Sequence, residues 1–179
     1  MAKHIVILFG SPRVDGNTDK LTAAFIEGAT SAGNTVTMFR VADMAIGGCR
    51  GCHHCFEEKG VCIQKDDMPQ ILDALRKADV MVMASPVYFF GVTAQLKLAV
   101  DRTFALLSEE RPTRRAALLM TAGRGGVDAC EGAIAMYQRM CRHSHWDAAG
   151  VVIAGGLQGK DDIVGRKELD DARALGREI

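Results

Sequence analysis

Four cysteines fall within fourteen residues of this 179-residue chain, and their spacing is suited to redox or metal chemistry. They follow the pattern C-x2-C-x2-C-x6-C and are Cys49, Cys52, Cys55 and Cys62. Four thiolates at such intervals can surround one soft metal centre, whereas disulfides between such close neighbours are strained. The spacing therefore favours a metal or electron-transfer site over a structural disulfide.

The residues alone leave the contents of this cysteine loop open. A 4Fe-4S cluster would use all four thiolates, and free thiols without a metal are the second interpretation. His53 and His54 lie between the second and third cysteines and allow a zinc site as a third interpretation, although adjacent loop histidines more often face solvent. Cys130 and Cys141 lie outside the loop, and we expect them to pack as small apolar residues.

A glycine-containing loop at residues 10–18 is the second chemical feature, because it follows an apolar run and opens a helical pattern. The amides and dipole of a helix N-terminus attract an anion. Ser11, Asn17 and Thr18 can donate hydrogen bonds, and Arg13 can supply positive charge. The loop lacks the lysine of a Walker A motif and the second glycine of G-x-G-x-x-G. It predicts a phosphate site of another kind, with a capped helix lacking any ligand as the alternative.

Three consecutive aromatic residues, Tyr88, Phe89 and Phe90, lie in a loop between Pro86 and Gly91. Aromatic rings in such a loop can lie against a planar heterocycle while nearby amides reach its polar edge. Alternatively, the rings cover the end of a sheet. The presence of a phosphate loop in the same chain favours a planar, phosphorylated cofactor.

These features require elements that position them, and short apolar runs alternate with helical periodicity along the chain. Strands are predicted at Ile5–Phe9, Thr35–Arg40, Val80–Ala84, Ala116–Thr121 and Val151–Ala154. Helices are predicted at Thr18–Ser31, Asp67–Lys77, Thr93–Leu107, Val127–His143 and Lys167–Ile179. The pattern indicates an α/β, doubly wound parallel sheet, whose ligands bind beyond the carboxyl ends of the strands.

Residues 41–66 show neither helical nor strand periodicity, and a connection of about 25 residues is long for an α/β fold. This excursion contains all four clustered cysteines. We expect residues 1–179 to form a single domain with the Cys-rich excursion at about 41–66. A turn is expected at residues 111–115, before the fourth strand.

The composition excludes several classes of partner. The 22 basic and 22 acidic residues cancel, so no charge signal favours nucleic acid or an anionic membrane surface. The apolar run Ile5–Phe9 is too short for a signal peptide or a membrane span. We therefore expect a cytoplasmic protein whose partners are small molecules or further copies of itself.

Three separated motifs together carry a resemblance to a known family. They are Gly10-Ser11-Pro12-Arg13 with Gly16-Asn17-Thr18; Ser85-Pro86-Val87-Tyr88-Phe89 with Gln95-Leu96-Lys97 and Asp101-Arg102; and the cysteine loop ending in Lys65-Asp66-Asp67-Met68. In this order, over essentially the whole chain, the sequence resembles the flavodoxin-like NAD(P)H-dependent FMN reductases. More narrowly, it resembles the iron-sulfur flavoproteins.

The resemblance implies a five-stranded parallel sheet of order 2-1-3-4-5 that binds FMN at its carboxyl edge, near a subunit interface of a homodimer or homotetramer. It implies that the phosphate is held by Ser11, Arg13, Asn17 and Thr18. The isoalloxazine would be lined by Pro86, Val87, Tyr88, Phe89 and Gly91, with a third wall of Thr121, Ala122 and Gly123. The four cysteines match the run that holds a 4Fe-4S cluster in some members, although many relatives keep similar cysteines without an obvious cluster.

The implied function is an FMN-dependent oxidoreductase that uses NADH or NADPH to reduce quinone, nitroaromatic, azo or flavin acceptors. The alternative is an iron-sulfur flavoprotein that relays electrons from ferredoxin through a 4Fe-4S cluster and FMN. A binding module without turnover is a third interpretation. Because the chemistry would reside on FMN, no catalytic side chain is expected, and His143 and His145 are interpreted as packing or surface groups. Asp101 and Arg102 are interpreted as a structural or interface pair.

Overall fold

The computed structural model describes residues 1–109 and 115–179, so most of the turn predicted at residues 111–115 lies outside the described part. Five strands form one parallel sheet of order β2-β1-β3-β4-β5. They are β1 (His4–Phe9), β2 (Thr35–Arg40), β3 (Val80–Pro86), β4 (Arg115–Thr121) and β5 (Asp147–Ala154). The chain reverses its direction of travel across the sheet after β2, so β1 and β3 flank a topological switch point. The predicted fold class and strand order are confirmed.

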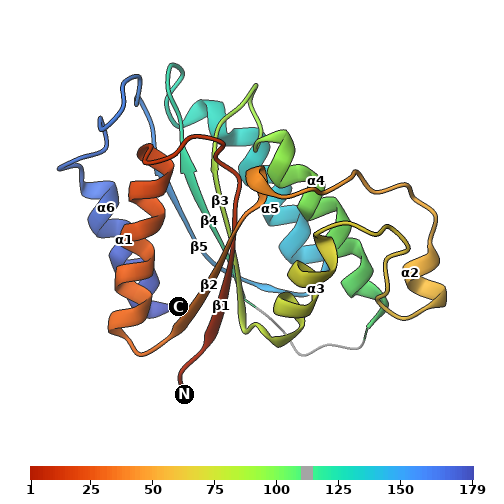
Figure 1. Ribbon diagram of the computed structural model, residues 1–179. Helices are drawn as coiled ribbons and strands as arrows, with labels where there is room; N and C mark the ends of the chain where they lie inside the picture. The colour runs from red at the N-terminus through yellow and green to blue at the C-terminus, as the bar shows by residue number, and fades with distance from the viewer. Residues whose placement is uncertain (110–114) are drawn as a thin grey trace.

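Helices cover both faces of this sheet, with α1 and α6 on one side and α3, α4 and α5 on the other (Figure 1). Their bounds are α1 (Asn17–Ser31), α3 (Met68–Lys77), α4 (Ala94–Arg102), α5 (Glu131–His143) and α6 (Lys167–Glu178). The predicted helix 93–107 is α-helical only to Arg102 and continues as a 3-10 helix, Thr103–Ser108. In the described part of the chain, no helix is both long and apolar enough to cross a membrane.

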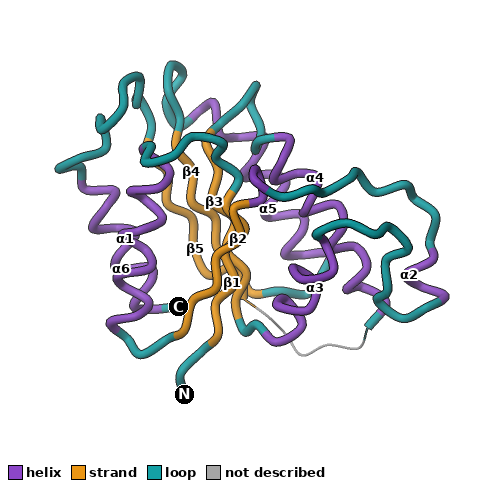
Figure 2. The backbone as a smooth tube through the Cα atoms, in the orientation of Figure 1, coloured by secondary structure: helices purple, strands orange, loops and turns teal. Residues whose placement is uncertain are grey.

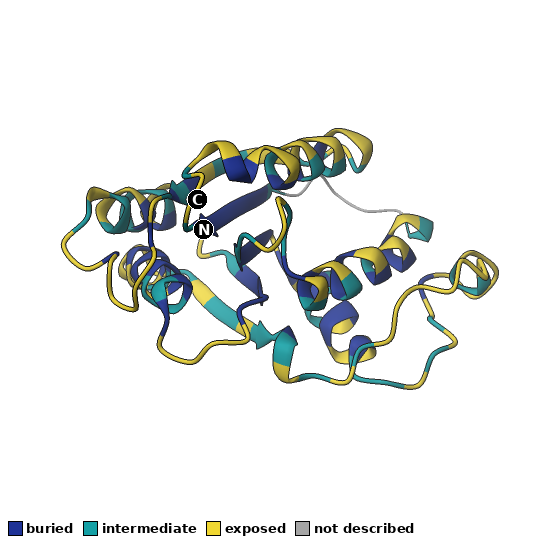
Figure 3. Ribbon diagram, turned by 90° about the horizontal axis from the view of Figure 1, so that it is seen from above, coloured by how far each residue is buried: buried dark blue, intermediate teal, exposed yellow. Residues whose placement is uncertain are grey.

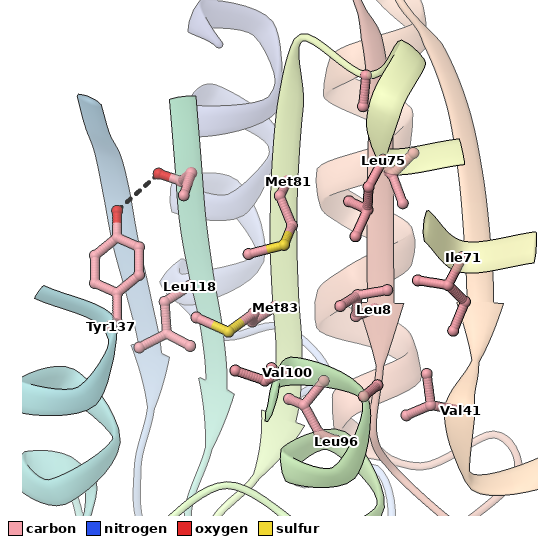
Figure 4. Packing of buried hydrophobic residues seen from close by; sticks show 14 of the residues in the cluster. Leu8, Val41, Ile71, Leu75, Met81, Met83, Leu96, Val100, Leu118 and Tyr137 are labelled. Atoms are coloured by element: carbon pink, nitrogen blue, oxygen red, sulfur yellow. Dashed lines mark hydrogen bonds between the residues drawn. The ribbon is translucent and has the colours of Figure 1, made fainter. Parts of the chain in front are cut away.

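The central strands are apolar on both faces, which explains why their sequences read as continuous hydrophobic runs. Figure 4 shows Leu8, Met83 and Leu118 of the sheet packed near Leu96 of α4. The neighbouring strand residues, including Ile7, point to the opposite face and pack with the residues of α1 and α6. Cys130 and Cys141, the free cysteines outside the loop, are buried among the apolar residues between the sheet and α3, α4 and α5, so their predicted apolar packing is confirmed.

Strand β5 begins at Asp147, four residues earlier than predicted. The prediction missed this start because residues 147–150 lack an apolar run. They belong to an edge strand whose side chains are partly exposed, and such a strand needs no continuous hydrophobic sequence. Its register with β4 also shifts between Ala116 and Ala117. Because β5 is an edge strand, its start could not be predicted from a pattern of hydrophobic residues.

The excursion at residues 41–66 contains only a 3-10 turn, Val41–Asp43, and the four-residue helix α2 (His54–Glu57). Figures 1 and 2 show it as a long loop beyond α3 and α4, on the side away from the sheet. The view from above in Figure 3 shows the same separation and a largely exposed backbone around α2. The excursion must therefore be held by contacts outside the hydrogen-bonded sheet.

Candidate cofactor cavity and cysteine site

A cavity of about 350 Å³ lies at the carboxyl edge of the sheet, where the loops gather at the top of Figure 1. It is lined by Ser11, Arg13, Gly16, Asn17, Thr18, Pro86, Val87, Tyr88, Thr121, Ala122, Gly123, Arg124, Leu157 and Gln158. Ten of the twelve residues predicted to bind a cofactor are in this set. The structure therefore brings the loops after the first, third and fourth strands to one place.

Hydrogen bonds that continue the sheet beyond its strands hold these loops together. The amide of Gly10 donates to the carbonyl of Ala84 at 2.8 Å. The amide of Val87 donates to the carbonyl of Thr121, also at 2.8 Å. The loop after β5 joins them, because the amide of Leu157 donates to the carbonyl of Ala122 at 2.9 Å. The cavity wall is thus an extension of the sheet.

Two predicted site residues, Phe89 and Gly91, lie outside the cavity lining. Tyr88 and Gly91 exchange two backbone hydrogen bonds of 3.0 and 3.1 Å, which closes a tight turn with Phe89 and Phe90 at its tip. Both phenylalanines have a left-handed backbone, with φ of 45° and 67°. This turn leaves the Phe89 side chain 98% exposed, so only Tyr88 of the three aromatics borders the cavity.

The side chains of Asn17 and Thr18 are already engaged within the protein. The Thr18 and Thr121 hydroxyls lie 2.7 Å apart and are buried, which joins the start of α1 to the end of β4. The Asn17 amide donates to the carbonyl of Gly159 at 2.9 Å and accepts from the amide of Ile163 at 3.3 Å. Asn17 therefore ties the loop after β5 to the cavity, and its predicted contact with phosphate stays a prediction.

Positive charge and amide N–H groups converge at the start of α1. Arg40 donates to Asp19 at 2.6 Å and to the carbonyl of Arg13 at 3.0 Å, so the negative charge of Asp19 is neutralised. Asp19 accepts from the N-cap amide of Gly16 at 3.1 Å, whereas within the described residues the N-cap residue has no side chain that caps the next amides. Among the same residues, the Arg13 guanidinium has no ion-pair partner. Ser11 adds a hydroxyl that accepts from the Arg13 amide at 3.2 Å. These donors can receive an anion.

Sequence reasoning missed four lining residues: Gly16, Arg124, Leu157 and Gln158. Gly16 lies inside the motif already identified, and Arg124 directly follows the predicted third wall. The other two belong to the loop after β5, which carries no motif. The loop after β5 could have been predicted to line the cavity from topology, because the loop that follows each parallel strand lies at the same edge of the sheet.

The four clustered cysteines line a second cavity, of about 310 Å³, that shares no residue with the first. Arg102, Phe104 and His53 border the same cavity, whereas His54 does not. Burial raises the pKa of the Cys55 thiol, and the other three cysteines lie close enough to raise it further. The excursion thus gathers its thiols around one space.

A polar clasp made by Gly47, Asp66 and Arg102 closes the base of the excursion. Arg102, the last residue of α4, donates to the two oxygens of Asp66 at 2.8 and 3.0 Å and to the Gly47 carbonyl at 2.8 Å. Asp66 also accepts from the amides of Gly47 and Met68 at 3.0 and 3.1 Å. Burial alone would raise the pKa of Asp66, but these hydrogen bonds and the charge of Arg102 lower it to about 2.

The tip of the excursion has its own anchors. Arg76 of α3 donates to the Gly60 carbonyl at 3.0 Å. The rings of Phe56 and Phe104 lie with centroids 5.0 Å apart, and His53 meets Phe104 edge-on at 6.1 Å. Side chains from α3 and from the segment after α4 therefore fix the tip of the excursion, while the clasp fixes its base.

Comparison with known proteins shows the family to which this chain belongs. Residues 4–155 match the family model described as NADPH-dependent FMN reductase. The chain belongs to this family. An iron-sulfur flavoprotein of Archaeoglobus fulgidus is 31% identical over 176 residues, covering 96% of this chain and 76% of that protein. Another, from Methanocaldococcus jannaschii, is 38% identical over 99 residues, covering 55% of this chain and 51% of its own length.

A solved structure shows the same fold in a protein of the same general chemistry. The NAD(P)H:quinone oxidoreductase from Methanothermobacter marburgensis superposes with a TM-score of 0.73 at 20% identity, covering 99% of this chain and 96% of that one. At this identity the similarity establishes the flavodoxin-like fold. The family match, in turn, makes this chain an oxidoreductase of the FMN reductase family.

The first cavity fits the ligand that the family description names. A phosphate monoester needs hydrogen-bond donors and positive charge, which the uncapped amides of α1, Ser11 and Arg13 supply. A flat ring system needs apolar walls, which Pro86, Val87 and Tyr88 supply. The residues present therefore fit FMN.

The cysteine cavity fits a sulfur-rich group, because a buried N–H donor of Arg102 lies at its border. The Arg102 side chain is only 1% exposed, and its Nε has no hydrogen-bond partner among the residues that the structure describes. A buried N–H group beside four cysteines is matched by a sulfur acceptor. In the described residues, no three Cys, His, Asp or Glu side chains already converge as a metal site. Cluster binding therefore requires the thiols to turn into their shared cavity.

Proposed function

We propose that this protein is an FMN-dependent oxidoreductase that takes electrons from NADH or NADPH and passes them to a small-molecule acceptor. Quinones, nitroaromatics, azo compounds and free flavins are the acceptor classes considered. One observation carries the proposal: three loops far apart in sequence form a single cavity that combines a phosphate-binding set of donors with apolar walls for a flat ring. Membership of the FMN reductase family supports it.

The chain's own residues would bind and orient the cofactor. FMN, when bound, supplies the redox chemistry, accepting a hydride from the nicotinamide and returning two electrons to the acceptor. Ser11, Arg13 and the first amides of α1 would hold its phosphate, while Pro86 to Tyr88 would flank its ring. In the described lining there is no Asp, Glu, His, Lys or Cys.

A second candidate function is electron transfer, in which ferredoxin supplies electrons to a 4Fe-4S cluster and FMN in the same protein. Cys49, Cys52, Cys55 and Cys62 would be the ligands, and their common cavity with the buried, unpartnered Arg102 Nε favours this function. When bound, such a cluster carries single electrons. The relatives named iron-sulfur flavoproteins support the same assignment. Assembly as a homodimer or homotetramer and a cytoplasmic location stay predictions.

Reduction of the bound flavin in the absence of oxygen separates the two candidates. The protein is mixed in turn with NADH, NADPH and reduced ferredoxin, and the flavin absorbance is followed over time. Rapid bleaching by either nicotinamide supports the first function. Slow bleaching by both nicotinamides with rapid bleaching by ferredoxin supports the second. Protein that binds no added FMN, or flavin that none of the three donors reduces, would contradict both.

A further inference from the structure

Arg102 of α4, whose side chain is only 1% exposed, holds the base of the excursion, and its hydrogen bonds leave one donor unexplained. Its two terminal nitrogens complete the clasp with Asp66 and Gly47. The remaining donor, Nε, is buried and has no hydrogen-bond partner among the described residues. A buried N–H group without an acceptor destabilises the folded protein, so its retention needs an explanation.

The surroundings of Arg102 identify an acceptor. The residue borders the cysteine cavity together with all four clustered cysteines. Sulfur atoms are thus the acceptors that the excursion gathers in the cavity that Arg102 also lines.

We propose that the Nε–H of Arg102 donates a hydrogen bond to one of the cysteine sulfurs of this cavity when that sulfur ligates an iron-sulfur cluster. Arg102 then has two separate roles, because its terminal nitrogens position the excursion and its Nε sets the reduction potential of the cluster. The inference rests on the second candidate function. A hydrogen bond to a ligand sulfur stabilises the more negative, reduced cluster, and so raises its potential.

Lysine at position 102 separates these roles. Its side chain places a methylene where arginine has Nε, and its ammonium falls near the guanidinium carbon, where it still pairs with Asp66. The variant Arg102→Lys therefore keeps the charge and an ion pair with Asp66, loses the two-pronged contact, and removes the proposed donor. At a fixed solution potential, we expect the ratio of reduced to oxidised cluster to fall about tenfold, which corresponds to about 59 mV for one electron.

Asp66→Asn is the matched control, because it weakens the clasp and leaves Nε in place. It also removes a negative charge near the cluster, so its potential should stay the same or rise. A fall in the potential of Arg102→Lys that Asp66→Asn does not share supports the proposal. An unchanged potential in Arg102→Lys, or an equal fall in both variants, would overturn it and leave Arg102 a purely structural role.

A measurement on the unsubstituted protein tests the proposed hydrogen bond even if Arg102→Lys does not fold. The protein is produced with arginine labelled with 15N at Nε, the cluster is reduced, and hyperfine coupling is recorded by pulsed EPR. We expect coupling between the cluster spin and this nitrogen, and its absence would overturn the proposal. Purified protein that holds no iron would contradict the second candidate function and this inference together, whereas a cluster without coupling contradicts only the role of Arg102.

Discussion

The cofactor cavity and the cysteine cavity are built in different ways. The cofactor cavity is an extension of the sheet, and backbone hydrogen bonds such as Gly10 to Ala84 and Val87 to Thr121 fix its walls. The cysteine cavity lies at the outer part of the excursion, beyond α3 and α4 on the side away from the sheet (Figure 1). Its shape depends on a few side chains, chiefly Asp66 and Arg102.

The fold alone specifies the cofactor cavity but not the cysteine cavity. Any sequence that forms this sheet brings the same loops together at its carboxyl edge. The cysteine loop needs particular polar anchors, and losing one of them should disturb that loop without unfolding the sheet. The two sites should therefore respond independently to substitution, and four experiments test this expectation.

Cys52→Ser should have the largest effect. Loss of one ligand should abolish iron-dependent absorbance and bound iron, while FMN content stays unchanged because the cavities share no residue. Iron, sulfide and flavin analysis of protein purified without oxygen provides the measurement. Cys130→Ala, at a buried cysteine outside the loop, is the control and should retain iron. Loss of flavin from the Cys52 variant would show that the sites are coupled.

Arg13→Ala should weaken FMN binding by about 1.5–3 kcal/mol, because a charge-assisted hydrogen bond to the phosphate is lost. Titration of flavin-free protein with FMN, followed by fluorescence quenching, gives the dissociation constant. Arg139→Ala removes the same charge from an exposed position of α5 and should leave the constant unchanged. Equal affinity in the Arg13 variant and the wild type would remove Arg13 from the site.

Asp66→Asn should lower the free energy of unfolding by about 2 kcal/mol at neutral pH. The pKa of Asp66 falls from 3.8 to about 2 on folding, so its stabilisation is complete above pH 3.8 and disappears as pH drops towards 2. Urea unfolding of both proteins across this range provides the test. Asp171→Asn, which breaks an exposed pair with Lys167, should change stability by less than about 0.5 kcal/mol. A difference between wild type and Asp66→Asn that does not vary with pH would contradict this explanation.

Tyr88→Ala and Phe89→Ala should differ, and this is the smallest effect expected. Tyr88 borders the cavity, so its loss should weaken FMN binding by about 1 kcal/mol. Phe89 projects from the turn, and its loss should change binding by less than about 0.5 kcal/mol. The same fluorescence titration measures both variants. If Phe89→Ala weakened binding more than Tyr88→Ala, the side chain would have to reach the flavin in another arrangement of this turn.

The sequence predicted most of the sheet and of the first cavity, because both follow from hydrophobic periodicity and the direction of the strands. It could not predict that Phe89 turns away, since this depends on left-handed conformations at Phe89 and Phe90. The proposed pairing of Asp101 with Arg102 was wrong. Asp101 instead pairs with Lys97 at 2.6 Å, and Arg102 pairs with Asp66.

The clasp shows why such contacts escape sequence reasoning. Asp66 and Arg102 are 36 residues apart, and no periodicity or motif spacing links an excursion to the end of a helix. Only the packing of the loop against α4 brings them together. Long-range polar pairs of this kind need coordinates, whereas a loop that follows a strand can be placed from topology alone.

The visible spectrum of protein purified without oxygen, with flavin and iron analysis before and after addition of NADPH, tests whether one chain holds two separate redox sites. Our account predicts one FMN per chain, whose absorbance bands bleach on reduction, together with about four irons. Colourless protein that takes up no added FMN would contradict the assignment of the first cavity, and flavin without iron would contradict that of the second.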